Sequence, residues 1–123
     1  MRAMISGGNT TVYVSDLNAA VRFYCDTLGC ELVNRVPEHW ALVSAGPGVN
    51  IGLHPQSPRG PKPGARGAMS IGFNVTRPLA EVVRTLEDRG VRFDGHSDSP
   101  KEPVRLSFFS DPDGNPLYLC EYK

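Results

Sequence analysis

The amino-acid sequence predicts an α+β fold made of two tandem βαβββ modules. The first observation is an internal repeat, because the strand, helix and glycine that run from Val14 to Gly29 recur from Val75 to Gly90. The second is that each copy closes with two strands around a Gly/Pro turn. We therefore expect a single domain with modules at residues 1–54 and 69–123, joined by a Pro/Gly-rich linker at residues 55–68.

The first module opens with a strand at residues 9–14, which are rich in Thr, Val and Tyr. A helix follows, in which Asp16 can accept hydrogen bonds from the first amides and Gly29 supplies a left-handed stop. The apolar stripe of this helix consists of Leu17, Val21, Tyr24 and Leu28. Three further strands are expected at residues 30–36, 39–44 and 49–54.

The second module repeats this order. The expected elements are a strand at residues 70–75, a helix at 78–89 and closing strands at 105–110 and 116–121. Residues 94–103 are interpreted as a polar loop that covers a pocket. Asp111-Pro-Asp-Gly-Asn115 is interpreted as a turn rather than a catalytic motif, since Asp accepts backbone hydrogen bonds there and Gly takes a positive φ.

Composition narrows the classes of function. The 13 Lys and Arg residues are balanced by 13 Asp and Glu residues, so a general binder of nucleic acid or of an anionic membrane is not expected. No apolar run approaches the roughly 18 residues that span a bilayer, and no signal core is seen, so we expect a cytoplasmic protein. Cys25, Cys30 and Cys120 form no CxxC pair and are expected to be reduced packing thiols.

Short motifs cover nearly the whole chain: Val14-Ser-Asp-Leu17, Phe23-Tyr24, Leu28-Gly29, Arg89-Gly90-Val91 and Phe109-Ser-Asp-Pro-Asp-Gly-Asn115. With the repeat, they resemble the vicinal oxygen chelate superfamily, which groups glyoxalase I, extradiol dioxygenases, and fosfomycin and bleomycin resistance proteins. The resemblance implies mixed sheets that curl around a shared cavity, a small-molecule ligand and a homodimer. It does not specify the reaction, because one scaffold hosts many chemistries.

The resemblance also locates the positions at which metal-dependent members carry His, Glu or Gln. In this chain the four positions are Asn9, Gly52, Ser70 and Tyr118. None supplies the imidazole, thiolate or carboxylate that transition-metal sites usually require. We therefore expect no metal, no cofactor and no catalytic residue at these positions.

Strand alternation predicts which other side chains face the implied cavity. In the preferred register Trp40, Leu42, Leu106 and Phe108 face inward, whereas a one-residue slip turns His39, Arg105, Ser107 and Phe109 inward. The candidate ligand-binding residues are Asn9, Tyr13, Trp40, His54, Phe108 and Tyr118. Gly52 and Gly72 are expected to leave space for a flat aromatic ligand, while His39 and His96 are interpreted as loop or strand-end residues.

The predicted function is metal-free binding or sequestration of an aromatic or planar small molecule, such as an antibiotic. Two alternatives stay open. One is a lyase, isomerase or dioxygenase-like enzyme that uses His54 as a base or an unusual ligand. The other is a module that recognises a protein partner and keeps only a vestigial cavity.

Overall fold

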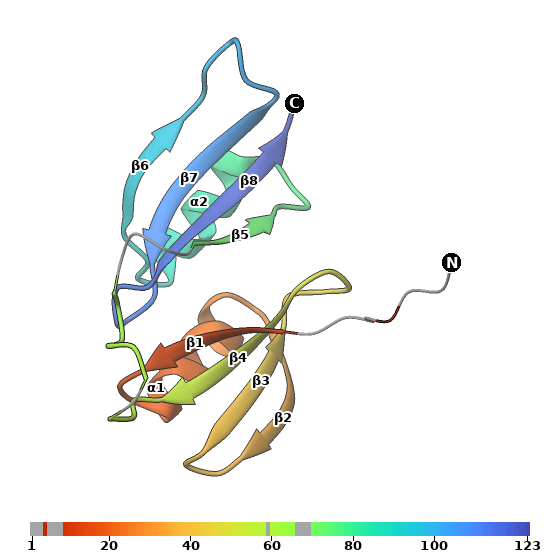
Figure 1. Cartoon of the computed structure of the whole chain (residues 1–123). Helices are drawn as coiled ribbons and strands as arrows, with labels where there is room; N and C mark the ends of the chain where they lie inside the picture. The colour runs from red at the N-terminus through yellow and green to blue at the C-terminus, as the bar shows by residue number, and fades with distance from the viewer. Residues whose placement is uncertain (1–3, 5–8, 59, 66–69) are drawn as a thin grey trace. The chain divides into compact units, whose positions relative to one another are not determined.

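The computed structural model describes residue 4 and residues 9–58, 60–65 and 70–123, which belong to two compact units, residues 1–60 and 61–123 (Figure 1). Each unit contains one four-stranded mixed sheet with a helical layer on one face. The predicted tandem βαβββ fold is confirmed. Of the predicted linker, residues 59 and 66–68 lie outside the described residues. Within the described part of the chain, no helix is long and apolar enough to cross a membrane.

Unit 1 follows the order β1-β4-β3-β2 across its sheet. Its elements are β1 (Thr10–Val14), α1 (Leu17–Val21), η1 (Arg22–Thr27), β2 (Glu31–Val36), β3 (Trp40–Ser44) and β4 (Asn50–Pro55). Strands β1 and β4 are parallel, and the other pairs are antiparallel. Thr11 and Leu42 both stand opposite Gly52, so one row of residues crosses three strands.

The helical segment of unit 1 begins and ends as the sequence predicts. Asp16 Oδ1 accepts a hydrogen bond from the Ala19 amide at 3.0 Å, and Gly29 has a φ of +84°. Between these ends the helix widens into a π-helix, η1, which the sequence pattern did not predict. The Cys30 amide then reaches back to the Tyr24 carbonyl at 2.9 Å, and Tyr24 is fully buried.

Unit 2 follows the matching order β5-β8-β7-β6. Its elements are β5 (Ile71–Asn74), α2 (Leu79–Asp88), β6 (Phe93–Ser97), β7 (Val104–Ser110) and β8 (Pro116–Tyr122). The interpretation of residues 94–103 as a loop is wrong for residues 94–97, which lie in β6. The apolar pattern missed this strand because β6 is an edge strand with a bulge and only Phe93 is apolar.

One face of each sheet packs against the helices and forms the core. In unit 1 this face buries Val12, Val14, Ala41, Val43, Ile51 and Leu53, and in unit 2 it buries Ser107, Phe109, Leu117 and Leu119. Phe108 stands opposite Tyr118, which confirms the preferred register of the β7–β8 hairpin. The slipped register is wrong, because it would turn the fully buried Ser107 and Phe109 away from the helix side of the sheet.

The Asp111-to-Asn115 segment is a turn, as predicted. Asp111 Oδ1 accepts hydrogen bonds from the amides of Asp113 at 3.0 Å and Asn115 at 2.9 Å, and Gly114 has a φ of +90°. Asn115 Oδ1 in turn accepts from the Gly64 amide at 3.0 Å. The turn therefore also ties the segment before β5 to unit 2.

Candidate functional site

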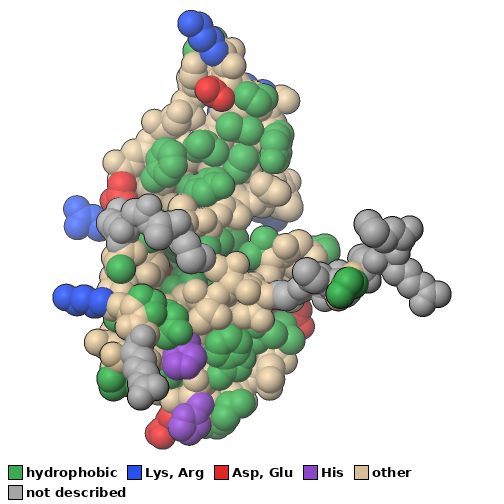
Figure 2. All heavy atoms as spheres, in the orientation of Figure 1, with side chains coloured by type: hydrophobic (Ala, Val, Ile, Leu, Met, Phe, Trp, Pro, Cys, Tyr) green, Lys and Arg blue, Asp and Glu red, His purple; other side chains and the backbone are tan. Residues whose placement is uncertain are grey.

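Three aromatic side chains gather on the helix-free face of the unit 1 sheet. Tyr13, His54 and Trp40 come from the adjacent strands β1, β4 and β3, and all three are half-buried. The ring centroids of Tyr13 and His54 are 5.0 Å apart, and those of Trp40 and His54 are 6.3 Å apart. The helices lie behind the sheets in Figure 1, and Figure 2 shows hydrophobic side chains gathered on the exposed sheet face of each unit.

The indole of Trp40 lies directly on Gly52 of the neighbouring strand. A Cβ atom at position 52 would stand 2.0 Å from Trp40 Cη2, closer than side chains tolerate. The expectation that Gly52 leaves space for a ligand is therefore wrong, because the protein's own ring fills that space. The glycine instead lets the indole lie against the strand.

Unit 2 also has an aromatic ring packed on a glycine of the neighbouring strand. The ring of Tyr118 lies on Gly72 of strand β5, and a Cβ atom there would stand 2.2 Å from Tyr118 Cζ. Phe108 lies beside it, with ring centroids 6.2 Å apart and planes inclined by 50°. The space expected at Gly72 is thus also occupied. A ligand on this face would meet the outer surfaces of the two rings, of which Phe108 is 38% exposed.

His54 supplies the imidazole of the unit 1 aromatic group. Its Nδ1 donates a hydrogen bond to the Pro55 carbonyl oxygen at 2.6 Å. A carbonyl oxygen only accepts, so Nδ1 carries the hydrogen, and in the neutral ring Nε2 is left as an acceptor. The hydrogen bond therefore orients the ring and leaves an acceptor nitrogen on its other side.

Asn9 precedes β1 and is exposed. Its Nδ2 donates to Thr11 Oγ1 at 3.4 Å, so the amide interacts along the start of its own strand. The structure thus brings Tyr13, Trp40 and His54 together in unit 1 and Phe108 and Tyr118 together in unit 2. Asn9 belongs to neither aromatic group, since its side-chain amide bonds to Thr11 of the adjoining strand.

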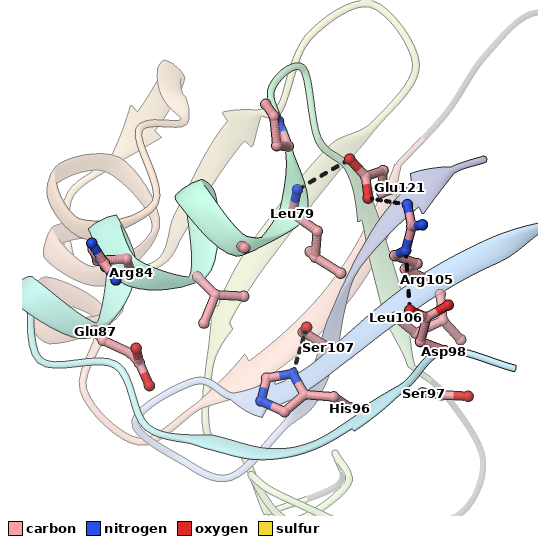
Figure 3. Close-up of a pocket in the computed structure, with 13 residues that line it drawn as sticks. Leu79, Arg84, Glu87, His96, Ser97, Asp98, Arg105, Leu106, Ser107 and Glu121 are labelled. Carbon is pink, nitrogen blue, oxygen red and sulfur yellow. Dashed lines mark hydrogen bonds and ion pairs between the residues drawn. The ribbon is translucent and has the colours of Figure 1, made fainter.

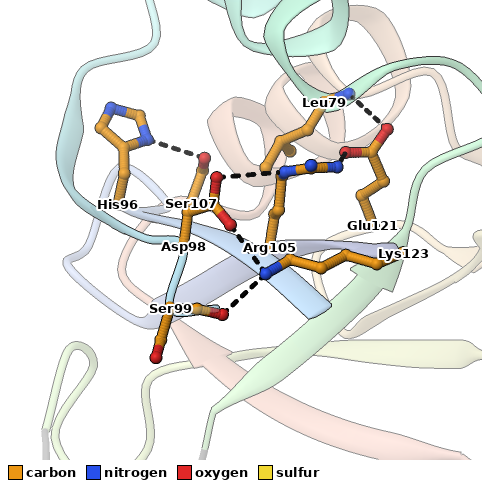
Figure 4. A network of polar contacts seen from close by, with 8 residues as sticks. All are labelled: Leu79, His96, Asp98, Ser99, Arg105, Ser107, Glu121 and Lys123. Atoms are coloured by element: carbon orange, nitrogen blue, oxygen red, sulfur yellow. Dashed lines mark hydrogen bonds and ion pairs between the residues drawn. The ribbon is translucent and has the colours of Figure 1, made fainter. Parts of the chain in front are cut away.

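A polar network on the helix side of unit 2 was not predicted (Figure 4). Arg105 forms ion pairs of 3.1 Å with both Asp98 and Glu121, and Lys123 pairs with Asp98 at 2.9 Å. Glu121 Oε2 also accepts from the Leu79 amide at 3.2 Å, at the start of α2. Hydrogen bonds from Lys123, then from Arg105, lower the pKa of Asp98.

Comparison with known proteins identifies the family to which this architecture belongs. Residues 8–119 match the family model of the Glyoxalase/Bleomycin resistance protein/Dioxygenase superfamily. The chain belongs to this superfamily. Membership fits the two four-stranded mixed sheets, which structural relatives share at TM-scores between 0.7 and 0.8.

Individual known proteins resemble the chain over nearly its whole length. The protein YaeR of Escherichia coli K12 is 30% identical over 118 residues, which cover 89% of this chain and 91% of YaeR. The crystal structure of TnmS3, an antibiotic binding protein from Streptomyces sp. CB03234, is 29% identical with a TM-score of 0.79, covering 99% and 100% of the two chains. A superfamily member from Sphaerobacter thermophilus is 34% identical with a TM-score of 0.77, covering 97% and 99%.

The four positions that the resemblance assigns to metal ligands carry residues whose chemistry does not fit a divalent transition metal. Gly52 has no side chain, and the indole of Trp40 occupies the space beside it. Asn9 and Ser70 offer only neutral oxygens, and the Tyr118 ring packs on the neighbouring strand. Among the described residues, no three His, Cys, Asp or Glu side chains gather as a metal site.

Proposed function

We propose that the protein binds planar aromatic small molecules, such as an antibiotic, on the ring-bearing faces of its sheets and without a resident metal. The observation that carries this proposal is the seating of Trp40 on Gly52 and of Tyr118 on Gly72. Each ring occupies or adjoins a position where metal-dependent relatives carry a ligand. The similarity to TnmS3, which is described as an antibiotic binding protein, supports the same conclusion.

The geometry suits stacking rather than polar recognition. A ring that rests on a glycine is held on one side and presents its other side, and each good ring contact adds about 0.5–1.5 kcal/mol beyond the area that it buries. His54 adds one oriented acceptor beside Trp40. Apolar surfaces with few oriented polar groups are typical of small-molecule sites.

The experiment uses the fluorescence of Trp40, which is the only tryptophan in the chain. Titration with an anthraquinone, a phenazine and an acridine should quench this emission and raise the melting temperature for at least one class. Tyr118→Ala should weaken binding. Phe23→Leu is the matched control, because it removes a ring from η1 in the helical layer behind the unit 1 sheet.

Two results would contradict the proposal. One is the absence of any response to the panel, together with turnover of a small substrate. The other is a bound metal. Elemental analysis of protein purified without a His tag should find no stoichiometric Zn, Ni, Fe or Mn. A stoichiometric metal would refute the metal-free part of the proposal.

The proposal includes a homodimer, which the resemblance to the superfamily implies. Light scattering during size-exclusion chromatography should give twice the chain mass of 13.4 kDa. A monomer at all concentrations would remove the dimer and leave the ligand proposal to be judged by the titration.

An enzymatic function is the second candidate, and the orientation of His54 favours it. The acceptor Nε2 of a neutral imidazole can remove a proton from a substrate. If the protein turns over a small substrate, His54→Gln should abolish turnover. Unchanged turnover in this variant would exclude His54 as the base.

A further inference from the structure

An open groove of about 550 Å³ lies on the helix side of unit 2, between α2 and strands β6 and β7 (Figure 3). This volume is in the range of small-molecule sites. The groove faces away from the side of the sheet that carries Phe108 and Tyr118, since the buried Ser107 on its wall alternates with Phe108 along β7. It is therefore independent of the aromatic faces proposed above.

The internal repeat shows how unit 2 differs from unit 1 beside the groove. At the matching place in unit 1, Arg35 of β2 reaches across to α1 and donates a hydrogen bond to Asn18 Oδ1. The strand registers match Arg35 with His96, which is a shorter side chain. The first turn of α2 offers Leu79 and Ala80, which have no side-chain polar group to bridge the gap.

The wall formed by β6 holds an oriented imidazole. His96 Nδ1 lies 2.7 Å from the hydroxyl oxygen of Ser107, which is fully buried. The Phe93 ring stacks against His96 with centroids 6.0 Å apart and planes inclined by 24°. These two contacts fix the ring, so Nε2 is its remaining polar atom, and His96 is exposed enough for a ligand to reach.

The charges around the groove balance once Lys123, the second partner of Asp98, is counted with the two guanidinium groups, so recognition of a cation depends on Glu87. Three carboxylates and two guanidinium groups line it. Arg105 is already held by two of the carboxylates, Asp98 and Glu121. Glu87 has no ion pair among the described residues, and Figure 3 shows its side chain extending from α2 toward β6, the strand of His96. Leu79 and Val83 of α2 add an apolar surface.

We propose that this groove binds a small organic cation, an ammonium group attached to an apolar body. The Glu87 carboxylate supplies the opposite charge, and His96 Nε2 accepts a second hydrogen bond when Nδ1 carries its proton toward Ser107. The apolar body lies over Leu79 and Val83.

Nuclear magnetic resonance of the isotope-labelled full chain tests the proposal with three probes of matched size: phenethylamine, the neutral phenethyl alcohol and the anionic hydrocinnamate. Phenethylamine should shift amide signals of α2 and β6 and saturate at millimolar concentration. Glu87→Gln should weaken this binding about tenfold, because it removes a charge-assisted contact. Glu81→Gln is the matched control, since Glu81 lies on the same helix, pairs with Arg77 at 3.4 Å and does not line the groove.

Several results would overturn the proposal. Equal binding of phenethyl alcohol would show that the charge is not recognised, and tighter binding of hydrocinnamate would show that Arg84 selects anions instead. Shifts confined to the strands that carry Trp40 or Tyr118 would assign the probe to the aromatic faces. Equal losses in Glu87→Gln and Glu81→Gln would indicate a nonspecific charge effect.

Discussion

The substitution Gly52→Ala tests whether glycine seats the aromatic ring. The new Cβ atom would stand 2.0 Å from Trp40 Cη2 and 2.6 Å from Cζ2. Carbon atoms pack at about 3.5 Å, so the indole must retreat by about 1.5 Å or swing away from the strand. Overpacking of this kind costs about 1–3 kcal/mol, and here the half-buried indole can yield toward solvent, so we expect a cost of about 1–2 kcal/mol.

Because Trp40 is the only tryptophan, its emission reports the displacement directly. Gly52→Ala should shift the emission to longer wavelength and lower the melting temperature by about 4–8 °C. Gly48→Ala is the matched control, since a Cβ atom there meets nothing within 4 Å. An emission maximum and a melting temperature that match the wild type in Gly52→Ala would refute the seating of Trp40 on this glycine.

Three further outcomes follow from single contacts. Asp16→Ala should cost about 1 kcal/mol in urea unfolding, because it removes the hydrogen bond to the Ala19 amide. Asp111→Ala should lower the free energy of unfolding by about 3 kcal/mol, because the buried carboxylate accepts hydrogen bonds from two backbone amides and from Asn115 Nδ2. A smaller loss of stability than for Asp16→Ala would contradict this. Burial, with a smaller effect of Cys25, raises the pKa of the Cys30 thiol to about 11. Alkylation of Cys30, measured by mass spectrometry, should therefore be slow at neutral pH and accelerate as the pH rises toward that value. Rapid modification at neutral pH would show an exposed thiolate.

The fold was predictable because its signals are local. Asp16 begins one helical segment because its side chain accepts a backbone hydrogen bond. Gly29 ends that segment and Gly90 ends the next, because glycine readily adopts a positive φ. The extent of strand β6 escaped prediction because an edge strand needs no apolar alternation, and its residues Asp94 to Ser97 are polar or glycine. The π-helix has no signal in the apolar spacing.

The candidate site was predictable only in part. The five-residue turn from Asp111 to Asn115 placed Phe108 opposite Tyr118, and the structure confirms this pairing. The same reasoning could not say which way a large ring leans, and it assigned the space at Gly52 to a ligand although Trp40 fills it. The groove beside His96 depends on how α2 crosses the sheet, which sequence spacing does not encode.

The two units show where a duplicated module can change at little cost. Positions matched by the strand registers carry similar apolar residues on the helix face, where Leu53 and Leu119 are both buried. On the open face the matched positions differ in kind, with Gly52 in unit 1 and Tyr118 in unit 2. The buried centre of the helix face must fill a core, which keeps Leu53 and Leu119 alike. Residues at the edge of that face, such as Arg35 and His96, and residues on the open face differ between the units, so these positions can carry a different chemistry in each unit.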